Sequence, residues 1–273
     1  LMELSGIGQP DLLKSHGIEV KHELTGVGEH LRDHINAPIK FHMKRGDLSY
    51  NKRMQGLGPA WQVLRYVFQK RGFMSLPSAP MLAFLRTRDD METPDVQMHI
   101  VPYAVKNYKK RLLHDFPGIT MAVYQLRPES LGSIHIQSPL ASEQPAINFN
   151  FLSDQIDRDA MLGGVKKIRQ IMDTEAMKKV RGDEFLPGRE IESDDEILNY
   201  VRNTAETAYH PIGTCRMGQG PGAVVDDRLR VHGISGLRIA DGSIMPTMVS
   251  GNTNAACIMI GEKASDMIKQ DNS

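Results

Sequence analysis

The chain has 273 residues, a length that allows one domain or two. Hydrophobic residues make up 40% and charged residues 24%, values that are typical of a folded globular protein and exclude a disordered or fibrous one. The 33 basic and 33 acidic residues cancel, so bulk charge does not attract nucleic acid, and we expect no nucleic-acid partner.

The two cysteines, Cys215 and Cys257, are too few for a disulfide framework. They predict a reducing compartment, with a single bridge between them left open. No apolar run approaches the roughly 20 residues of a membrane-spanning helix, and no signal peptide is visible. We therefore expect a cytoplasmic protein and leave open a peripheral position at a membrane. Because the chain starts at Leu1 without an initiator methionine, we expect it to come from a longer protein.

The predicted elements begin with a short helix over residues 10–15, and Gly17 supplies the left-handed position after its end. A strand over 19–24, a glycine-rich turn at 25–28 and a strand over 36–43 follow.

Pro59 opens an amphipathic stretch that is typical of a helix with proline in its first turn. Beyond Asp95 the apolar residues recur with period two, which predicts strands that begin at Val96 and continue over 119–126, 133–137 and 147–151. These strands indicate a mainly antiparallel sheet. Two helices follow, one over 155–179 and one opened by a capping box of Ser193 and Glu196.

Three common kinds of site find no support in the sequence. Four G-x-G pairs lack the third glycine of a dinucleotide fingerprint and are interpreted as turns: Gly6/Gly8, Gly26/Gly28, Gly56/Gly58 and Gly218/Gly220. His30 and His34 have a spacing that zinc ligands use, but the glutamate of the metalloprotease motif is absent, so we expect no metal. No G-x-S-x-G nucleophile elbow is present.

The C-terminal region concentrates the polar residues that fit chemistry. His210 precedes a proline, which favours an extended backbone that projects the imidazole from a strand end or loop. Asp241 follows a predicted buried strand over 237–240, and residues 252–254 can cap an apolar helix over 255–269. Each feature alone also fits a structural role. Together they predict a cofactor site with a base beside it.

With these residues in place, the chain resembles the C-terminal half of the glucose-methanol-choline (GMC) oxidoreductases, FAD-dependent enzymes that oxidise alcohols. Residues 4–8 resemble the end of the family's second signature, and residues 26–34 resemble its GVGxNLxDH segment. The segments that start at His210 and Asp241 resemble its C-terminal motifs.

The resemblance implies a catalytic pair in which His210 accepts the hydroxyl proton and Asn252 holds the oxygen. A histidine near neutral pKa suits this role. It also implies FAD as the cofactor, with Ala240, Asp241 and Gly242 along the flavin. Thr253 and Asn254 would lie near the flavin's pyrimidine edge at a helix N-terminus. No metal is needed for this route.

The implied fold class combines α+β and α/β architecture. A partial Rossmann-like FAD-binding domain would comprise residues 1–35 and 209–273, the latter carrying the catalytic pair. Residues 36–208 would form a substrate-binding domain with a mainly antiparallel sheet and flanking helices.

By the same resemblance, the expected partners are a small-molecule alcohol, an electron acceptor that is quinone-like or oxygen, and the missing N-terminal half of the same enzyme. We expect the fragment alone to be inactive. The leading substrate is a neutral primary alcohol, because Pro80 stands where choline-specific members have a glutamate four residues before a phenylalanine, here Phe84. A choline dehydrogenase-type enzyme and a non-catalytic remnant or interaction module are the alternatives.

Overall fold

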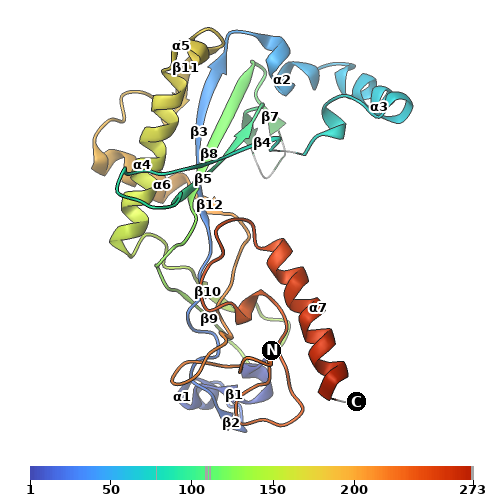
Figure 1. Cartoon of the computed structure of the whole chain (residues 1–273), viewed down its shortest axis with the longest axis vertical. Helices are drawn as coiled ribbons and strands as arrows, with labels where there is room; N and C mark the ends of the chain where they lie inside the picture. Colours follow the sequence, from blue (N-terminus) through green and yellow to red (C-terminus); the bar gives the residue numbers. More distant parts are fainter. Residues whose placement is uncertain (78, 108–109, 111, 272–273) are drawn as a thin grey trace. The chain divides into compact units, whose positions relative to one another are not determined.

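The computed structural model describes residues 1–77, 79–107, 110 and 112–271 (Figure 1). The chain divides into two compact units built from interleaved segments. Unit 1 comprises residues 1–34, 126–157 and 207–273, and unit 2 comprises 35–125 and 158–206. The structure differs from the predicted division over residues 126–157, which the sequence analysis placed in the substrate-binding domain.

Residues 126–157 belong to unit 1 because their backbone bonds join them to its first segment. The N–H of Ile134 donates to the carbonyl of Gly28, at 2.8 Å, and Leu31 pairs with Gly132. Within this segment β9 (Ser133–His135) and β10 (Ala146–Asn148) form an antiparallel pair.

The sheet of unit 2 confirms the predicted mainly antiparallel arrangement. Its strand order is β11 (Arg181–Leu186), β3 (Ile35–Met43), β8 (Gly118–Gln125), β5 (Val96–Val101) and β4 (Met81–Leu85). Every pair along this path is antiparallel, and β12 (Glu206–Thr207) also pairs with β3. The central strand β8 is buried over its whole length, as expected for a strand covered on both faces.

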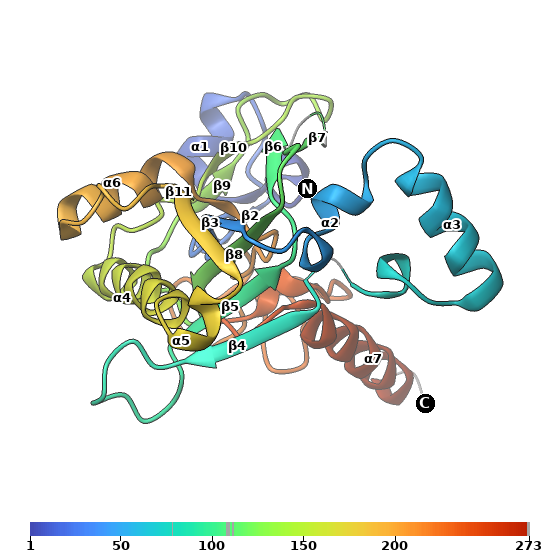
Figure 2. The ribbon, with the colours of Figure 1, turned by 90° about the horizontal axis from the view of Figure 1, so that it is seen from above.

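Helices lie on both sides of this sheet (Figure 2). On one side are α4 (Gln155–Met172) and α6 (Asp194–Thr204). On the other are α2 (Tyr50–Arg53) and α3 (Gly58–Gln69), with the small hairpin of β6 (Val105–Asn107) and β7 (Leu112–Leu113). A Cβ on Gly164 of α4 would lie 2.6 Å from a methyl of Val123, so glycine permits the close approach of α4 to β8.

Capping residues decide where two of the predicted helices begin and end. The capping box of Ser193 and Glu196 is present, with both reciprocal hydrogen bonds, and α6 begins immediately after Ser193. The single helix predicted over 155–179 is wrong in its last part, because Thr174 starts a new helix, α5 (Glu175–Lys178), by accepting from the N–H of Met177. Hydroxyl side chains that bond the backbone locally favour such a restart.

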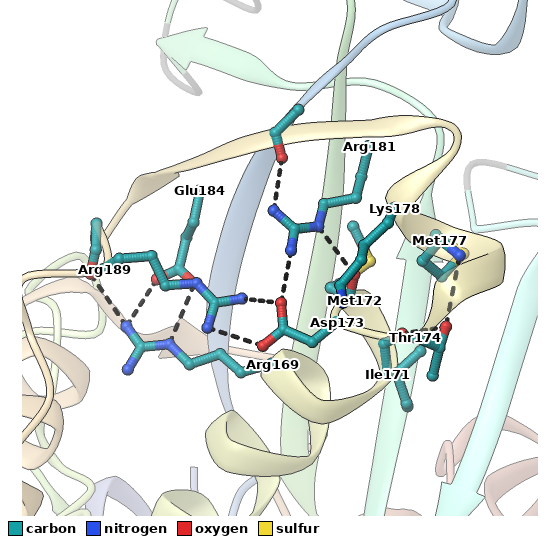
Figure 3. Close-up of polar contacts among 12 residues, drawn as sticks. Arg169, Ile171, Met172, Asp173, Thr174, Met177, Lys178, Arg181, Glu184 and Arg189 are labelled. Carbon is teal, nitrogen blue, oxygen red and sulfur yellow. Dashed lines mark hydrogen bonds and ion pairs between the residues drawn. The ribbon is translucent and has the colours of Figure 1, made fainter.

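An ion-pair network joins α4 to β11 and the loop that follows it (Figure 3). Arg169 binds Glu184 in bidentate fashion, with N–O distances of 2.7 and 3.1 Å. Arg189 pairs with both Glu184 and Asp173, and Arg181 pairs with Asp173. The Glu184 side chain is fully buried, and these arginines are the ion-pair partners that a buried carboxylate needs.

Replacing Arg169 by methionine is expected to lower the free energy of unfolding by about 3 kcal/mol, the low end of the range for breaking a buried pair, since Arg189 remains beside Glu184. Urea denaturation of the full-length protein, followed by circular dichroism, measures this loss. The matched control Lys178→Met breaks the exposed pair with Glu175 and should leave the midpoint unchanged. Equal midpoints for both variants would contradict the prediction.

Unit 1 is assembled mainly from loops around one apolar core. Its short elements are η1 (Glu3–Ser5), α1 (Pro10–Ser15), η4 (Gly242–Ile244) and a parallel pair of β1 (Ile7–Gly8) and β2 (His22–Glu23). The long C-terminal helix α7 (Asn254–Asp271) contributes Ile260 and Ala264 to the core, which also contains Ile7, Val27, Ile212, Val224, Val225, Val231 and Ile244. The predicted helix over 10–15 is confirmed, and the predicted strand over 19–24 is reduced to two residues.

The predicted buried strand over 237–240 is wrong. These residues are partly exposed, and the single bridge in this stretch that the structure describes joins Arg238 to Arg230. The N–H of Ile239 donates to Leu229 and the carbonyl of Leu237 accepts from Val231, which is too little backbone pairing for a strand. The Rossmann-like part therefore stays a prediction.

Both cysteines are free thiols, Cys215 buried and Cys257 half-buried. In the part of the chain that the structure describes, none of the helices combines the length and apolar content that a membrane crossing needs. Within that same part, no group of three or more His, Cys, Asp or Glu side chains is arranged to hold a metal ion.

Candidate active site

His210 lies in a loop of unit 1 and is fixed through its backbone. Asp33 accepts a hydrogen bond from the N–H of His210, at 2.8 Å, and a second from the hydroxyl of Thr207. The N–H of Ala208 donates to the carbonyl of His34, at 2.8 Å. The two segments that carry His34 and His210 are therefore held side by side, although 176 residues separate them in sequence.

A chain of hydrogen bonds runs through the two imidazoles. Nε2 of His34 lies 3.0 Å from the carbonyl oxygen of Leu126, and Nδ1 of His34 lies 2.9 Å from Nδ1 of His210. Nε2 of His210 lies 3.1 Å from Nδ2 of Asn252. The rings meet edge to face, with an interplanar angle of 89°.

The carbonyl of Leu126 sets the direction of this chain, because a carbonyl oxygen only accepts. Nε2 of His34 therefore carries a proton, and a His34 ring with this one proton accepts through Nδ1. His210 then donates from Nδ1, which leaves its Nε2 as an acceptor that faces the amide of Asn252. The network fixes the tautomer in which Nε2 of His210 has a lone pair.

Burial shifts the pKa values of two groups of the site, His210 and Asp33. His210 is buried, and this desolvation lowers its pKa from the ordinary histidine value, while the nearby Asp33 carboxylate partly offsets the effect. Burial raises the pKa of Asp33, against the hydrogen bonds that it accepts from Thr207 and from backbone N–H groups. His210 is thus favoured in its neutral form, the one that can accept a proton.

Asn252 lies two residues after Ser250, whose side chain holds the same loop in place. Ser250 accepts a hydrogen bond from Arg127, at 2.9 Å, and Arg127 directly follows the Leu126 carbonyl that binds His34. The loop that carries Asn252 is therefore tied to the strand end that orients the two histidines. The sequence prediction that His210 and Asn252 approach each other is confirmed.

The residues predicted to bind the cofactor lie along a neighbouring cavity and the start of α7. Ala240 and Asp241 line a cavity of about 480 Å³, together with residues that include Val27, Gly28, Thr214, Cys215 and Ile239. Asp241 also caps η4 by accepting from the N–H of Ser243, at 2.8 Å. The volume falls in the range of about 300–1,000 Å³ that is usual for small-molecule sites.

Gly242 is the point where this cavity segment meets α7. A Cβ on Gly242 would lie 3.3 Å from Sγ of Cys257 in the first turn of the helix. Thr253, which is buried, and Asn254, which is exposed, stand at the helix start, where unpaired N–H groups and the helix dipole favour negative charge. Gly242 therefore lies against the first turn of the helix that begins at Asn254.

Two positioning residues escaped the sequence analysis. The spacing of His34 from His30 is one that zinc ligands use, and Asp33 stands beside it, but the structure turns both His34 and Asp33 toward His210. The pairing joins segments far apart in the chain, which sequence spacing does not reveal. The adjacent Asp-His dipeptide in the motif of residues 26–34 was the available indication.

Comparisons with known proteins give the proteins to which this chain is similar. The family model described as GMC oxidoreductase matches residues 128–261. An alcohol dehydrogenase [acceptor] from Pseudomonas putida is 37% identical over 98% of this chain and 48% of its own length. An oxygen-dependent choline dehydrogenase from Cronobacter sakazakii has the same identity and the same two coverages.

Among solved structures, a formate oxidase from Aspergillus oryzae superposes with a TM-score of 0.88 at 26% identity, covering 99% of this chain and 52% of that one. The chain belongs to the GMC oxidoreductase family, and it spans about half the length of the curated relatives it matches, corresponding to their C-terminal half. FAD is the cofactor of this family, as the resemblance implied.

The residues present fit part of FAD. The cavity lining is mostly apolar and includes two carboxylate residues, Glu3 and Asp241. Gly242, next to Asp241, lies against the first turn of α7. This donor set suits an aromatic ring system with a polar, hydrogen-bonding edge.

Proposed function

We propose that the full-length protein containing this chain oxidises a primary alcohol to an aldehyde with FAD as the cofactor. The observation that carries the proposal is the 3.1 Å contact between Nε2 of His210 and Nδ2 of Asn252, with the His210 tautomer fixed by His34. FAD, when bound, supplies the acceptor for the hydride that leaves the alcohol carbon.

His210 is the proposed base. The alcohol O–H has a pKa far above 7, so its proton must leave as the carbon–oxygen double bond forms. Nε2 of His210 receives that proton, and the resulting imidazolium still donates from Nδ1 to His34.

Asn252 is proposed to hold the alcohol oxygen. Its amide donates a hydrogen bond without titrating, so it stabilises negative charge on the oxygen and does not compete for the proton. Nδ2 of Asn252 lies 3.1 Å from Nε2 of His210, so an alcohol oxygen that displaces this hydrogen bond would contact both groups.

Five residues are proposed to hold the flavin. Ala240, Asp241 and Gly242 would lie along it, and Thr253 and Asn254 would place the N-terminus of α7 at its polar edge, where the dipole favours negative charge. In this proposal unit 1 is part of the FAD-binding domain, and unit 2 is the substrate-binding domain.

Choline is the second candidate substrate. It is favoured by the choline dehydrogenases among the relatives, which are 36–38% identical to this chain. Pro80 in place of the expected glutamate disfavours it, since a quaternary ammonium needs a carboxylate or aromatic partner. The electron acceptor is proposed to be quinone-like or oxygen.

The test is the visible absorption spectrum of the purified full-length protein, followed by anaerobic addition of primary alcohols and choline. We expect a flavin band that a neutral primary alcohol bleaches, and re-aeration then separates an oxidase from a dehydrogenase. Bleaching by choline alone would establish the second candidate. A colourless protein that cannot be loaded with FAD would overturn the proposal in favour of a non-catalytic module.

A further inference from the structure

Helix α3 exposes an apolar stripe. Leu57 directly precedes the helix, and Trp61, Leu64 and Phe68 follow at spacings of four, three and four, which places all four on one face. Each of these side chains is between 49% and 87% exposed. A surface helix of a globular protein normally turns such a stripe toward the core.

One polar side chain of α3 is turned inward instead of the stripe. Gln62 is buried, and its Oε1 has no hydrogen-bond partner within the described residues. Within unit 2, α3 extends away from the sheet in both views (Figures 1 and 2). The apolar stripe of α3 is therefore not packed against the sheet, and the buried side chain of the helix is polar.

Apolar surface continues beyond the helix. After α3 the chain forms η3 (Phe73–Ser75), where Phe73 and Met74 line an apolar cavity of about 340 Å³ together with Tyr50, Met54 and Leu76. Exposed apolar surface that gathers several large side chains marks an interaction site.

The segment of sequence that contains the stripe carries charge of one sign. Residues 48–88 contain seven basic residues and no acidic residue, although the whole chain is balanced. Lys52, Lys70 and Arg71 are exposed, and no ion pair involves these three side chains in the part of the chain that is described. Lys70 follows the last residue of α3, and its ammonium lies 5.2 Å from the centre of the Tyr66 ring.

We propose that α3, with its flanking basic residues, docks on the surface of a bilayer that contains anionic phospholipid. An interfacial helix buries Trp, Leu and Phe at the boundary between headgroups and acyl chains while Lys and Arg contact lipid phosphates. Trp61 and Phe68 of α3, with Lys70 and Arg71 just after it, match this distribution. The inference concerns attachment only and does not rest on the proposed reaction.

Charge distinguishes the bilayer from a protein partner. A symmetric contact between two copies of this face would bring the basic groups of each against those of the other, and like charges repel. A covering segment of the same protein would have to supply carboxylates for basic side chains that now face solvent. Anionic headgroups supply that charge at the same level as the apolar stripe.

The test is co-sedimentation of the full-length protein with vesicles of phosphatidylcholine alone or of an equal mixture with phosphatidylglycerol. We expect binding to the mixed vesicles only. The double variant Leu64→Glu/Phe68→Glu should abolish it, and Lys70→Gln/Arg71→Gln should weaken it at least about tenfold. Leu140→Glu, a matched change at an exposed leucine of unit 1, should bind as the unchanged protein does.

Light scattering of the same variants measures their oligomeric mass and shows whether a second copy of the protein covers the stripe. If Leu64→Glu/Phe68→Glu changes the oligomeric mass while vesicle binding persists, a second copy covers the stripe and the proposal is wrong. The proposal is also wrong if the unchanged protein does not bind the mixed vesicles. It is wrong as well if the Leu64→Glu/Phe68→Glu variant is insoluble and the Lys70→Gln/Arg71→Gln variant binds as the unchanged protein does. The lysine and arginine variant changes only exposed side chains, so it stays informative if the other misfolds.

Discussion

Replacing His210 by alanine in the full-length protein is expected to lower kcat for alcohol oxidation by about 10²–10⁴-fold, the usual contribution of a general base. The loss follows from the network, in which Nε2 of His210 is the acceptor that faces Asn252. The measurement is steady-state kinetics on the alcohol that bleaches the flavin. His16→Ala, a matched change at the end of α1, should leave kcat unchanged.

The dependence of kcat/KM on pH tests whether His210 acts as the base. A base must be neutral to act, and burial lowers the pKa of His210, so kcat/KM should stay on its plateau below the ordinary histidine pKa of about 6.5 and fall only at lower pH. This acid limb should disappear in His210→Ala. A near-unchanged rate, or an unchanged limb, would remove His210 from the mechanism.

The second large effect is expected at His34, which acts through His210. His34→Leu removes the acceptor for Nδ1–H of His210, so the imidazole is free to rotate and to adopt the other tautomer. We expect kcat to fall by at least about tenfold, as for residues that orient a catalytic histidine. KM should change less, because His34 is fully buried behind His210.

His34→Gln distinguishes positioning from simple packing. A glutamine amide can accept from His210 through its oxygen and donate to the Leu126 carbonyl through its nitrogen, so it reproduces both roles of His34. We expect this variant to recover most of the activity that His34→Leu loses. If both variants are equally impaired while thermal unfolding is unchanged, the ring orientation of His210 does not depend on this bond.

Local patterns predicted the fold well where neighbours in sequence decide the structure. The helix at Pro10, the capping box at Ser193 and the alternating strand that starts at Val96 all formed as expected, because their stabilising contacts lie within a few residues. The strand predicted over 237–240 failed because a strand depends on a partner, and sequence pattern does not state whether one is present.

In the candidate site, too, the sequence predicted some residues and missed those whose contacts join distant segments. His210 and Asn252 were predicted from motif resemblance, and their contact is present. Asp33 and His34 were assigned no role toward His210, since their bonds to it span more than 170 residues and leave no periodicity to detect. The outward orientation of α3 was likewise invisible, because an apolar stripe is the same in sequence whether it faces the core or solvent.

The interleaving of the two units places the site at the points where the chain passes from one unit to the other. His34 is the last residue before the first passage into unit 2, Leu126 is the first after the return, and Thr207 is the first after the second return. The hydrogen bonds among these residues can form only when both excursions have closed, and closing long loops costs entropy. Assembly of the site should therefore be a late event in folding, and recovery of activity should lag behind recovery of secondary structure during refolding.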